Sequence, residues 1–166
     1  MIIYCDMDGV LVNFERGAEE ALGHSFDSSI LDAVNRRDRE QILALKDRFW
    51  VNLPEMPEMR RLWNVIAKHQ AHILSAEATW DREAGVQYSR IGKLMWLKKH
   101  LGIPLMRTHI VRRTEKKDYA QSESGPNLLI DDFPKNIQEF QRAGGAAIHH
   151  TSVSQTLDEL RKLGIY

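Results

Sequence analysis

The chain begins with "MIIYCDMDGVL" (Met1–Leu11), in which a short apolar run leads directly into two acids and a glycine. The apolar run Ile2–Cys5 is typical of a buried strand. Asp6 and Asp8 follow it two residues apart, so in an extended chain their side chains share one face. Gly9 allows the backbone to turn sharply there and to approach a ligand closely.

The acid pair Asp6 and Asp8 has two interpretations. Aspartate and glycine are common in ordinary turns between a strand and a loop. The alternative is chemical, because two carboxylates this close disfavour each other's charged form unless a cation lies between them. A hard cation such as Mg²⁺ is the usual partner of carboxylate oxygens. The pair alone leaves both interpretations open.

Short apolar runs alternate with segments of helical periodicity along the rest of the chain. This alternation predicts an α/β fold with a doubly wound parallel sheet. Expected strands are residues 2–5, 71–74, 108–112, 127–130 and 146–149. Expected helices lie around residues 59–67, 91–101, 137–141 and 157–163.

Residues 14–57 interrupt this alternation, since they contain helical and charged segments but no clear strand. We interpret them as a small helical cap inserted after the first strand, which leaves residues 1–13 and 58–166 as the α/β core. Open α/β sheets bind ligands at the carboxyl ends of their strands. The cap is therefore expected to lie over that edge as a lid.

The composition is that of a globular protein of 166 residues, with 23 basic and 23 acidic side chains and 43% hydrophobic residues. Balanced charge argues against an extended nucleic-acid surface or a membrane contact. One cysteine excludes an internal disulfide. The chain has no signal-type segment and no apolar run long enough to span a membrane, so we expect a cytoplasmic protein. A homodimer is one assembly that the sequence allows.

A second acid pair, Asp131-Asp132, follows the apolar run "NLLI" (Asn127–Ile130). On its own it could cap the next helix, since Pro134 suits a first helical turn. Capping does not readily explain the same device at the ends of two strands. Parallel strands end at one edge of a sheet, so the two pairs together predict four carboxylates around one metal ion.

Ser75 and a pair of lysines follow two other expected strands. Ser75 and Ala76 end "HILSA", and Lys116 and Lys117 lie in "RRTEKKDYA". A single serine is most often a turn residue, and a charge run is most often a solvated face. At an edge rich in carboxylates, however, the serine hydroxyl, the backbone N–H groups after it and a lysine would suit a phosphate.

Four stretches of the chain resemble, in order and context, the four motifs of the haloacid dehalogenase-like (HAD) phosphohydrolases. They are "DMDGVL", "ILS", a lysine in "KKDYA" and "LLIDD". The resemblance extends from Asp6 to Asn136 and implies a HAD-like Rossmannoid core. Phe14, "FWVNLP" (Phe49–Pro54), "KLMWLKKHLG" and "LLIDDFPKN" are similar to the 5'(3')-deoxyribonucleotidases, which include compact bacterial and phage members.

The resemblance implies a role for each acid. Asp6 would be the nucleophile that forms an aspartyl-phosphate, and Asp8 would move protons to and from oxygen. Mg²⁺ would be held by the Asp6 side chain, the Asp8 carbonyl and a motif-four carboxylate, for which Asp132 is preferred. Asp131 and Asn136 would then orient the waters of the metal.

The phosphate would be held by Ser75, Ala76 and a lysine. Lys117 is preferred over Lys116, because its spacing before the paired aspartates and the residues after it suit the family lysine. Asp8 also favours a phosphatase or phosphotransferase, because dehalogenase members lack this second acid and ATPase members have threonine instead.

The resemblance implies that cap aromatics clamp the base and sugar of a nucleotide, with Phe14, Phe49 and Trp50 as candidates. Phe49 and Trp50 could equally fill the small core of the cap. The expected substrate is a small phosphate ester, best a nucleoside monophosphate. Alternatives are a sugar phosphate, a nucleic-acid 3'-phosphate end, or a non-catalytic domain that binds a nucleotide or a protein.

Overall fold

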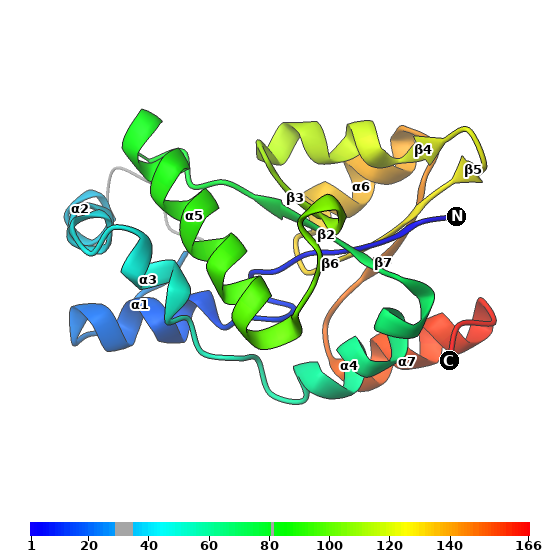
Figure 1. The fold of residues 1–166 in the computed structure, drawn as a ribbon, viewed down its shortest axis with the longest axis horizontal. Coiled ribbons are helices and arrows are strands. Elements are labelled where there is room, and N and C mark those ends of the chain that lie inside the picture. The colour runs from blue at the N-terminus through cyan, green and yellow to red at the C-terminus, as the bar shows by residue number, and fades with distance from the viewer. Residues whose placement is uncertain (29–34, 81) are drawn as a thin grey trace. The chain divides into compact units, whose positions relative to one another are not determined.

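A five-stranded parallel sheet is the centre of the fold in this computed structural model, which describes residues 1–28, 35–80 and 82–166 (Figure 1). The strand order is β3-β2-β1-β6-β7. The strands are β1 (Ile3–Cys5), β2 (His72–Ala76), β3 (Thr108–Val111), β6 (Leu128–Asp131) and β7 (Ala146–His149). The predicted α/β class is confirmed, and each expected strand is present with its ends shifted by at most two residues.

The strand order reverses next to β1. The chain runs outward from β1 through β2 to β3, and then crosses to the other side of β1 to form β6 and β7. The carboxyl ends of β1 and β6 therefore lie at a topological switch point, which is where open α/β sheets bind ligands.

Contacts divide the chain into two compact units. The sheet unit consists of residues 1–12, 55–76 and 106–166, and the helical unit consists of residues 13–54 and 77–105. Helices of the sheet unit are α4 (Met59–Ile66), η1 (Ala67–His69), η3 (Arg113–Tyr119), α6 (Pro134–Arg142) and α7 (Val153–Lys162). The short turn η2 (Leu105–Arg107) begins where the second segment of the helical unit ends.

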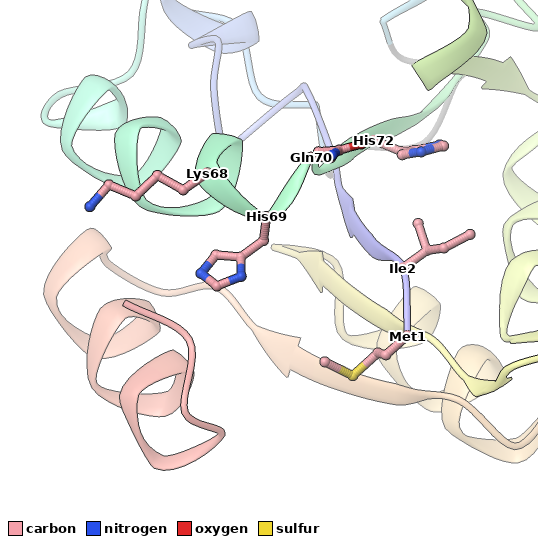
Figure 2. Close-up of a pocket in the computed structure, with 6 residues that line it drawn as sticks. All are labelled: Met1, Ile2, Lys68, His69, Gln70 and His72. Atoms are coloured by element: carbon pink, nitrogen blue, oxygen red, sulfur yellow. The ribbon is translucent and has the colours of Figure 1, made fainter.

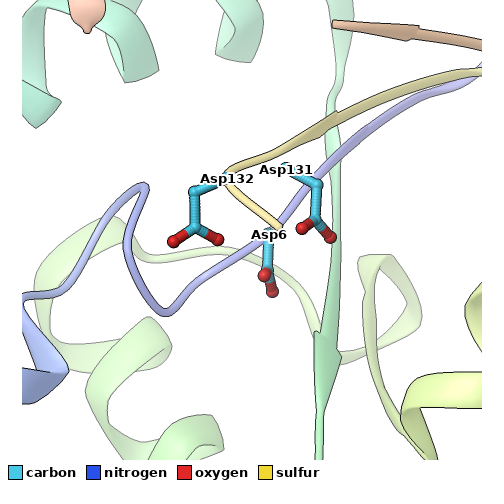
Figure 3. Close-up of side chains that lie close together, drawn as sticks. All are labelled: Asp6, Asp131 and Asp132. Carbon is cyan, nitrogen blue, oxygen red and sulfur yellow. The ribbon is translucent and has the colours of Figure 1, made fainter. Parts of the chain in front are cut away.

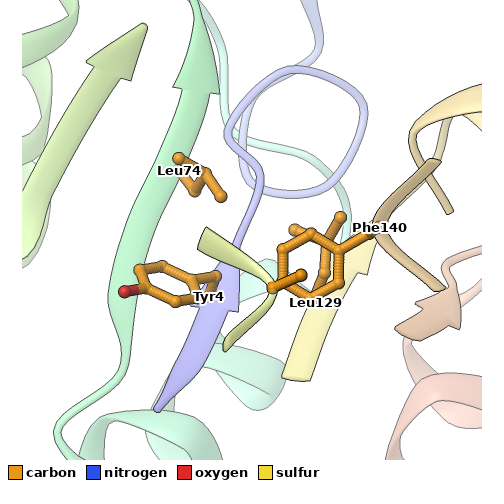
Figure 4. Packing of buried hydrophobic residues seen from close by; sticks show 5 residues of the cluster. Tyr4, Leu74, Leu129 and Phe140 are labelled. Atoms are coloured by element: carbon orange, nitrogen blue, oxygen red, sulfur yellow. The ribbon is translucent and has the colours of Figure 1, made fainter. Parts of the chain in front are cut away.

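The sheet is covered by helices of its own unit. η3 contacts α6, α6 contacts β6 and β7, and α7 contacts both β7 and α4 (Figure 1). Tyr4, Leu74, Leu129 and Phe140 pack with Ala120 in a buried cluster between the strands and α6 (Figure 4). A small antiparallel hairpin of β4 (Gln121–Ser122) and β5 (Gly125–Pro126), which the sequence did not predict, leads from η3 into β6.

The helical unit contains α1 (Phe14–Leu22), α2 (Arg36–Ala44), α3 (Asp47–Val51) and α5 (Arg82–Leu101). The predicted cap covered residues 14–57 and left 77–105 in the core, whereas contacts group 77–105 with the helical unit. Part of the predicted cap, residues 29–34, lies outside the described residues. Among those described, no helix of either unit is long and apolar enough to cross a membrane.

Close packing of α5 on α3 explains this grouping. A Cβ atom added to Gly92 would lie 2.5 Å from the Cβ of Trp50 and 2.7 Å from the Asp47 carbonyl oxygen, so glycine allows the two helices to touch. The indole Nε1 of Trp96 also donates to the Leu53 carbonyl oxygen at 2.8 Å. The apolar periodicity of α5 did not predict that it packs against α3.

The buried face of α5 includes a lysine beside apolar residues. Ile91 and Met95 are exposed, whereas Lys93, Trp96 and Leu97 are buried. Lys93 is only 1% exposed, although a lysine in this position is typical of a helix surface. The apolar spacing predicted a helix over 91–101, and α5 includes that range but begins nine residues earlier, at Arg82.

Candidate active site

Three carboxylates meet at the carboxyl edge of the sheet. The Asp6 backbone N–H donates to the Ile130 carbonyl at 2.8 Å, which sets Asp6 beside Asp131 at the adjacent strand ends. Asp6, Asp131 and Asp132 each offer one oxygen within 4.8 Å of the others (Figure 3). The convergence expected for the two acid pairs is thus present for three of the four side chains. The charge of Asp8 lies near enough to act on Asp132.

Lys116 lies between two of these acids. Its Nζ is 2.9 Å from Asp6 Oδ1 and 2.8 Å from Asp131 Oδ2, and its side chain is 2% exposed. Lys117, the preferred lysine, is exposed, whereas the alternative, Lys116, is the one that meets the acids. The reason is helical phase: η3 is a 3₁₀ helix of three residues per turn, and adjacent residues point in different directions. A role for either lysine in holding phosphate stays a prediction.

Electrostatics keep Lys116 charged. Burial opposes its positive charge, but attraction and hydrogen bonds from Asp6 and Asp131 outweigh burial and raise the pKa of Lys116. Burial, followed by repulsion from Asp6, raises the pKa of Asp131, while Lys116 and the Phe133 N–H act against that rise. One protonated lysine therefore offsets two neighbouring carboxylates.

Hydrogen bonds to Asp131 occupy both of its oxygens. Oδ1 accepts from the Phe133 N–H at 2.9 Å and from Asn136 Nδ2 at 3.0 Å. Oδ2 accepts from Lys116 Nζ at 2.8 Å and from Asn136 Nδ2 at 3.0 Å. An ionised carboxylate has about four lone-pair positions. These contacts use that capacity, so Asp131 is placed to hold its neighbours and not to bind a metal ion strongly.

Asp132 is in a different environment. Its carboxylate packs against Gly9, where an added Cβ would lie 1.9 Å from Asp132 Oδ2 and where φ is +74°. The residue as a whole is exposed, but its carboxylate faces the other acids. Partial burial, followed by repulsion from Asp6, Asp131 and Asp8, raises the pKa of Asp132 to about 7.

The donor set fits a hard divalent cation. Asp6 Oδ1 accepts from the Met7 N–H at 2.7 Å and contacts Lys116, so these contacts leave Oδ2 for another partner. Asp132 carries negative charge that its neighbours oppose. Carboxylate oxygens are the ligands that Mg²⁺ prefers, and a cation between Asp6 and Asp132 would relieve the repulsion.

Ser75 and Ala76 lie at the same edge of the sheet. Cys5 pairs with Ile73 in the parallel register, so Ser75 lies two residues beyond the partner of the last β1 residue. Ser75 is fully buried and Ala76 is partly buried. Their expected role as phosphate ligands stays a prediction.

The three cap aromatics form one cluster in the helical unit. Ring centroids are 5.4 Å apart for Phe14 and Phe49, and 5.1 Å apart for Phe49 and Trp50. Phe49 and Trp50 are buried, so both pack in the core of that unit. Trp80 also joins the cluster and lies 5.0 Å from the Arg39 guanidinium carbon, a pairing that no sequence pattern indicated. Substrate contacts by Phe14, Phe49 and Trp50 stay predictions.

Two further residues of the site were missed by sequence reasoning. Arg113 donates from Nη1 to Asn136 Oδ1 at 3.1 Å, and it lies one 3₁₀ turn before Lys116. His149 Nε2 donates to the Asp132 carbonyl oxygen at 3.0 Å and so holds the loop that carries Asp132. The i, i+3 spacing of Arg113 and Lys116 was the one available signal, and it requires knowing that this segment is a 3₁₀ helix.

Comparison with known proteins gives a likeness of fold. A hydrolase from Streptococcus pneumoniae TIGR4 aligns over 98% of this chain and 97% of its own, at 14% identity and a TM-score of 0.53. L-2-haloacid dehalogenase from Xanthobacter autotrophicus aligns over 98% of this chain and 83% of its own, at 13% identity and a TM-score of 0.51. A protein from Bacteroides fragilis, described as a haloacid dehalogenase-like hydrolase, aligns over 95% and 92%, at 14% identity and a TM-score of 0.52.

No protein-family model and no curated protein matches the chain. At these identities the structural likeness speaks for the fold alone. The chain thus has the α/β fold of the haloacid dehalogenase-like hydrolases, and what it does must be argued from its own residues.

Proposed function

We propose that the protein is a Mg²⁺-dependent phosphomonoesterase that works through an aspartyl-phosphate on Asp6. The observation that carries the proposal is Lys116, buried between Asp6 and Asp131 beside the exposed acid Asp132. A carboxylate can attack a phosphate ester only if the repulsion between the two anions is offset. A fixed lysine and a cation site next to one carboxylate meet that need.

Asp6 would attack phosphorus through one carboxylate oxygen, while Lys116 and the Met7 N–H hold the carboxylate through Oδ1. The bond from phosphorus to the ester oxygen breaks, and Asp8, as a carboxylic acid, gives its proton to the leaving alcohol. Asp8 then takes a proton from a water molecule whose oxygen attacks phosphorus. The bond between phosphorus and Asp6 breaks, and inorganic phosphate leaves.

The cation would be held by the carboxylates of Asp6 and Asp132 and by the Asp8 carbonyl oxygen. When bound, Mg²⁺ supplies positive charge that polarises phosphate oxygens. Asp131 and Asn136 keep Lys116 in place, and His149 holds the Asp132 loop.

For the substrate we propose a nucleoside monophosphate, best a deoxyribonucleotide. The support is the resemblance of the motif residues to the 5'(3')-deoxyribonucleotidases and the partly exposed Phe14 of the aromatic cluster. A sugar phosphate or a nucleic-acid 3'-phosphate end would use the same chemistry. The non-catalytic alternative is disfavoured, because the chain keeps both acid pairs, the serine and a buried lysine.

The test is a panel of phosphomonoesters with Mg²⁺, with Asp6→Asn as the variant and the exposed Asp118→Asn as the matched control. Asp6→Asn should lower kcat by at least about 10³-fold, because the nucleophile is lost. Asp118→Asn should retain activity, and excess EDTA should abolish it. Equal turnover by Asp6→Asn and the parent contradicts the mechanism, and better turnover of sugar phosphates contradicts the nucleotide proposal.

A further inference from the structure

Arg113, in η3, connects that helix to α6. Its guanidinium donates to Asn136 Oδ1 at 3.1 Å and makes a two-pronged contact with Glu139, from Nη1 at 2.8 Å and from Nη2 at 3.4 Å. Its side chain is 30% exposed, and that of Glu139 is 25% exposed. Because Glu139 neutralises the guanidinium, Arg113 is placed as a structural cation and not as a free ligand for phosphate.

Arg113 and Asp131 contact opposite ends of the Asn136 amide and favour the same orientation of it. A guanidinium can only donate hydrogen bonds, so the amide oxygen must face it. The Nδ2 group of Asn136 is then directed at Asp131, 3.0 Å from each carboxylate oxygen. A flipped amide would set its oxygen against two carboxylate oxygens, and the buried Asp131 would lose two hydrogen bonds.

Further contacts connect the Asn136 amide to Asp131, Lys116 and Asp6. Asp131, held by Asn136 and by the Phe133 N–H, receives Lys116 at 2.8 Å. The same ammonium group is 2.9 Å from Asp6 Oδ1. The contacts thus form an unbroken chain from Arg113 through Asn136, Asp131 and Lys116 to Asp6. Each member except Arg113 is at least nine-tenths buried, so the links from Asn136 to Asp6 are shielded from competing water.

We propose that Arg113 is a positioning residue: through the Asn136 amide it orients Asp131 and Lys116, and so fixes the rotamer of Asp6. This inference rests on the proposed function for its effect on catalysis, but the amide orientation itself does not depend on it. Groups that hold catalytic or metal-binding residues from behind typically change activity by about 10–100-fold when removed.

The first test compares Arg113→Met with Arg161→Met. Arg161 is the matched control, because it pairs with Asp158 on the exposed face of α7, and both side chains of that pair are more than half exposed. Arg113→Met should lower kcat by about 10–100-fold and change KM by less than about threefold, since substrate binding is not its task. Arg161→Met should leave both unchanged. A rise in KM with kcat unchanged overturns the proposal.

The second test asks whether Arg113 acts through Asn136. In an Asn136→Ala background, Arg113→Met should lower kcat by less than about twofold, because the link is already broken. Full additivity of the two losses would show that Arg113 acts by another route and would overturn the inference.

A third measurement needs no activity. The side-chain NH₂ signals of Asn136 in NMR spectra, assigned by their loss in Asn136→Asp, should shift and exchange with solvent at least about tenfold faster in Arg113→Met. Unchanged shifts and exchange overturn the inference. If the wild-type protein hydrolyses no phosphomonoester, the proposed function fails, and this measurement still decides whether Arg113 orients the amide.

Discussion

The two ends of the parallel sheet both gather ionisable side chains, but they handle charge in opposite ways. At the carboxyl end, Lys116 lies between buried Asp6 and Asp131, and Asp132 adds a third carboxylate. At the amino end, His72 and His109 lie side by side on β2 and β3. The first group consists of charges that attract and repel, and the second forms a neutral pair.

The two histidines form a hydrogen bond with each other. His72 Nδ1 and His109 Nε2 are 3.0 Å apart, the rings are inclined by 7°, and their centroids are 5.3 Å apart. Such rings lie nearly edge to edge in one plane, so one N–H donates to the lone pair of the other nitrogen. Tyr4 packs against both rings nearly at right angles.

A hollow beside this pair has no comparable convergence of polar groups. It is lined by Met1, Ile2, Lys68, His69, Gln70 and His72 (Figure 2). In Figure 2 the Lys68 side chain extends away from His72, so its ammonium group does not meet that imidazole.

Burial of ionisable groups therefore does not by itself mark a functional site. Burial lowers the pKa of His72 and of His109, and the pair meets it by remaining neutral and hydrogen-bonded. At the other end, burial and three like charges raise the pKa of Asp132 to about 7. Charge that the protein leaves uncompensated is the better indicator of a ligand site.

The largest expected effect is that of removing the positive charge from the carboxyl end. Lys116→Met leaves two buried carboxylates without their partner and should lower the free energy of unfolding by about 3–5 kcal/mol. The exposed neighbour provides the control, since Lys117→Met should change it by no more than about 0.5 kcal/mol. Urea unfolding measures both. Equal effects of the two substitutions would mean that Lys116 does not hold the acids.

Gly9 tests how tightly the backbone approaches Asp132. An alanine there meets both a φ of +74° and a Cβ position 1.9 Å from Asp132 Oδ2. Gly9→Ala should cost about 2–4 kcal/mol in unfolding free energy, from the left-handed backbone and the steric overlap together.

The matched control for Gly9 is Gly164, which has a φ of +76° and no heavy atom within 4 Å of an added Cβ. Gly164→Ala should therefore cost only about 1–2 kcal/mol, the backbone contribution alone. Thermal unfolding of both variants checks the difference. An equal cost would mean that Asp132 is not packed against Gly9.

Adding Mg²⁺ should stabilise the folded protein. If Mg²⁺ binds the folded state at the acids, it should stabilise the protein by about 2.7 kcal/mol at a concentration 100 times its Kd. Asp132→Asn should largely abolish this gain. Isothermal titration and thermal unfolding with MgCl₂ measure it, and Asp118→Asn serves as the control. An undiminished gain in Asp132→Asn would remove Asp132 from the ligand set.

The remaining effects are pH dependences of opposite sign at the two ends of the sheet. Without a divalent cation, the raised pKa of Asp132 means that the folded protein holds a proton that the unfolded chain has lost. Stability should then fall as pH rises from about 4 towards about 7, and Asp132→Asn should remove that slope.

At the amino end the sign is reversed. The lowered pKa values of His72 and His109 mean that the unfolded chain takes up protons first as pH falls. The contribution of these histidines to stability should be fully present above about pH 6.5. It should be lost below that pH, with a slope of at most about 1.4 kcal/mol per pH unit for each histidine.

The difference in unfolding free energy between the parent and His72→Gln/His109→Gln, measured from pH 8 to 5, isolates the contribution of the histidine pair. Exposed His69→Gln is the control. A double variant whose pH dependence matches the parent's would show that the histidine pair does not contribute to it.

The local pattern of apolar residues was enough to predict the strands and the edge of the sheet at which the acids lie. Apolar runs such as Asn127–Ile130 are legible because a buried strand needs little beyond its own residues. Parallel strands then bring their carboxyl ends to one edge, which places Asp6 beside Asp131 without further information. The β4–β5 hairpin was missed, because Gln121–Ser122 and Gly125–Pro126 have no strand pattern of their own.

The α/β class, the strand positions and the convergence of Asp6 with Asp131 and Asp132 could therefore be predicted from the sequence, since these follow from periodicity and sheet geometry. The fold was needed to show that Lys116 and not Lys117 contacts the acids, that Asp131 and Asp132 have different surroundings, and that Arg113 is connected to them. These features depend on the phase of a 3₁₀ helix and on which oxygens a neighbouring helix occupies. Such contacts join residues distant in the chain, and adjacent lysines or aspartates look alike until the fold places them.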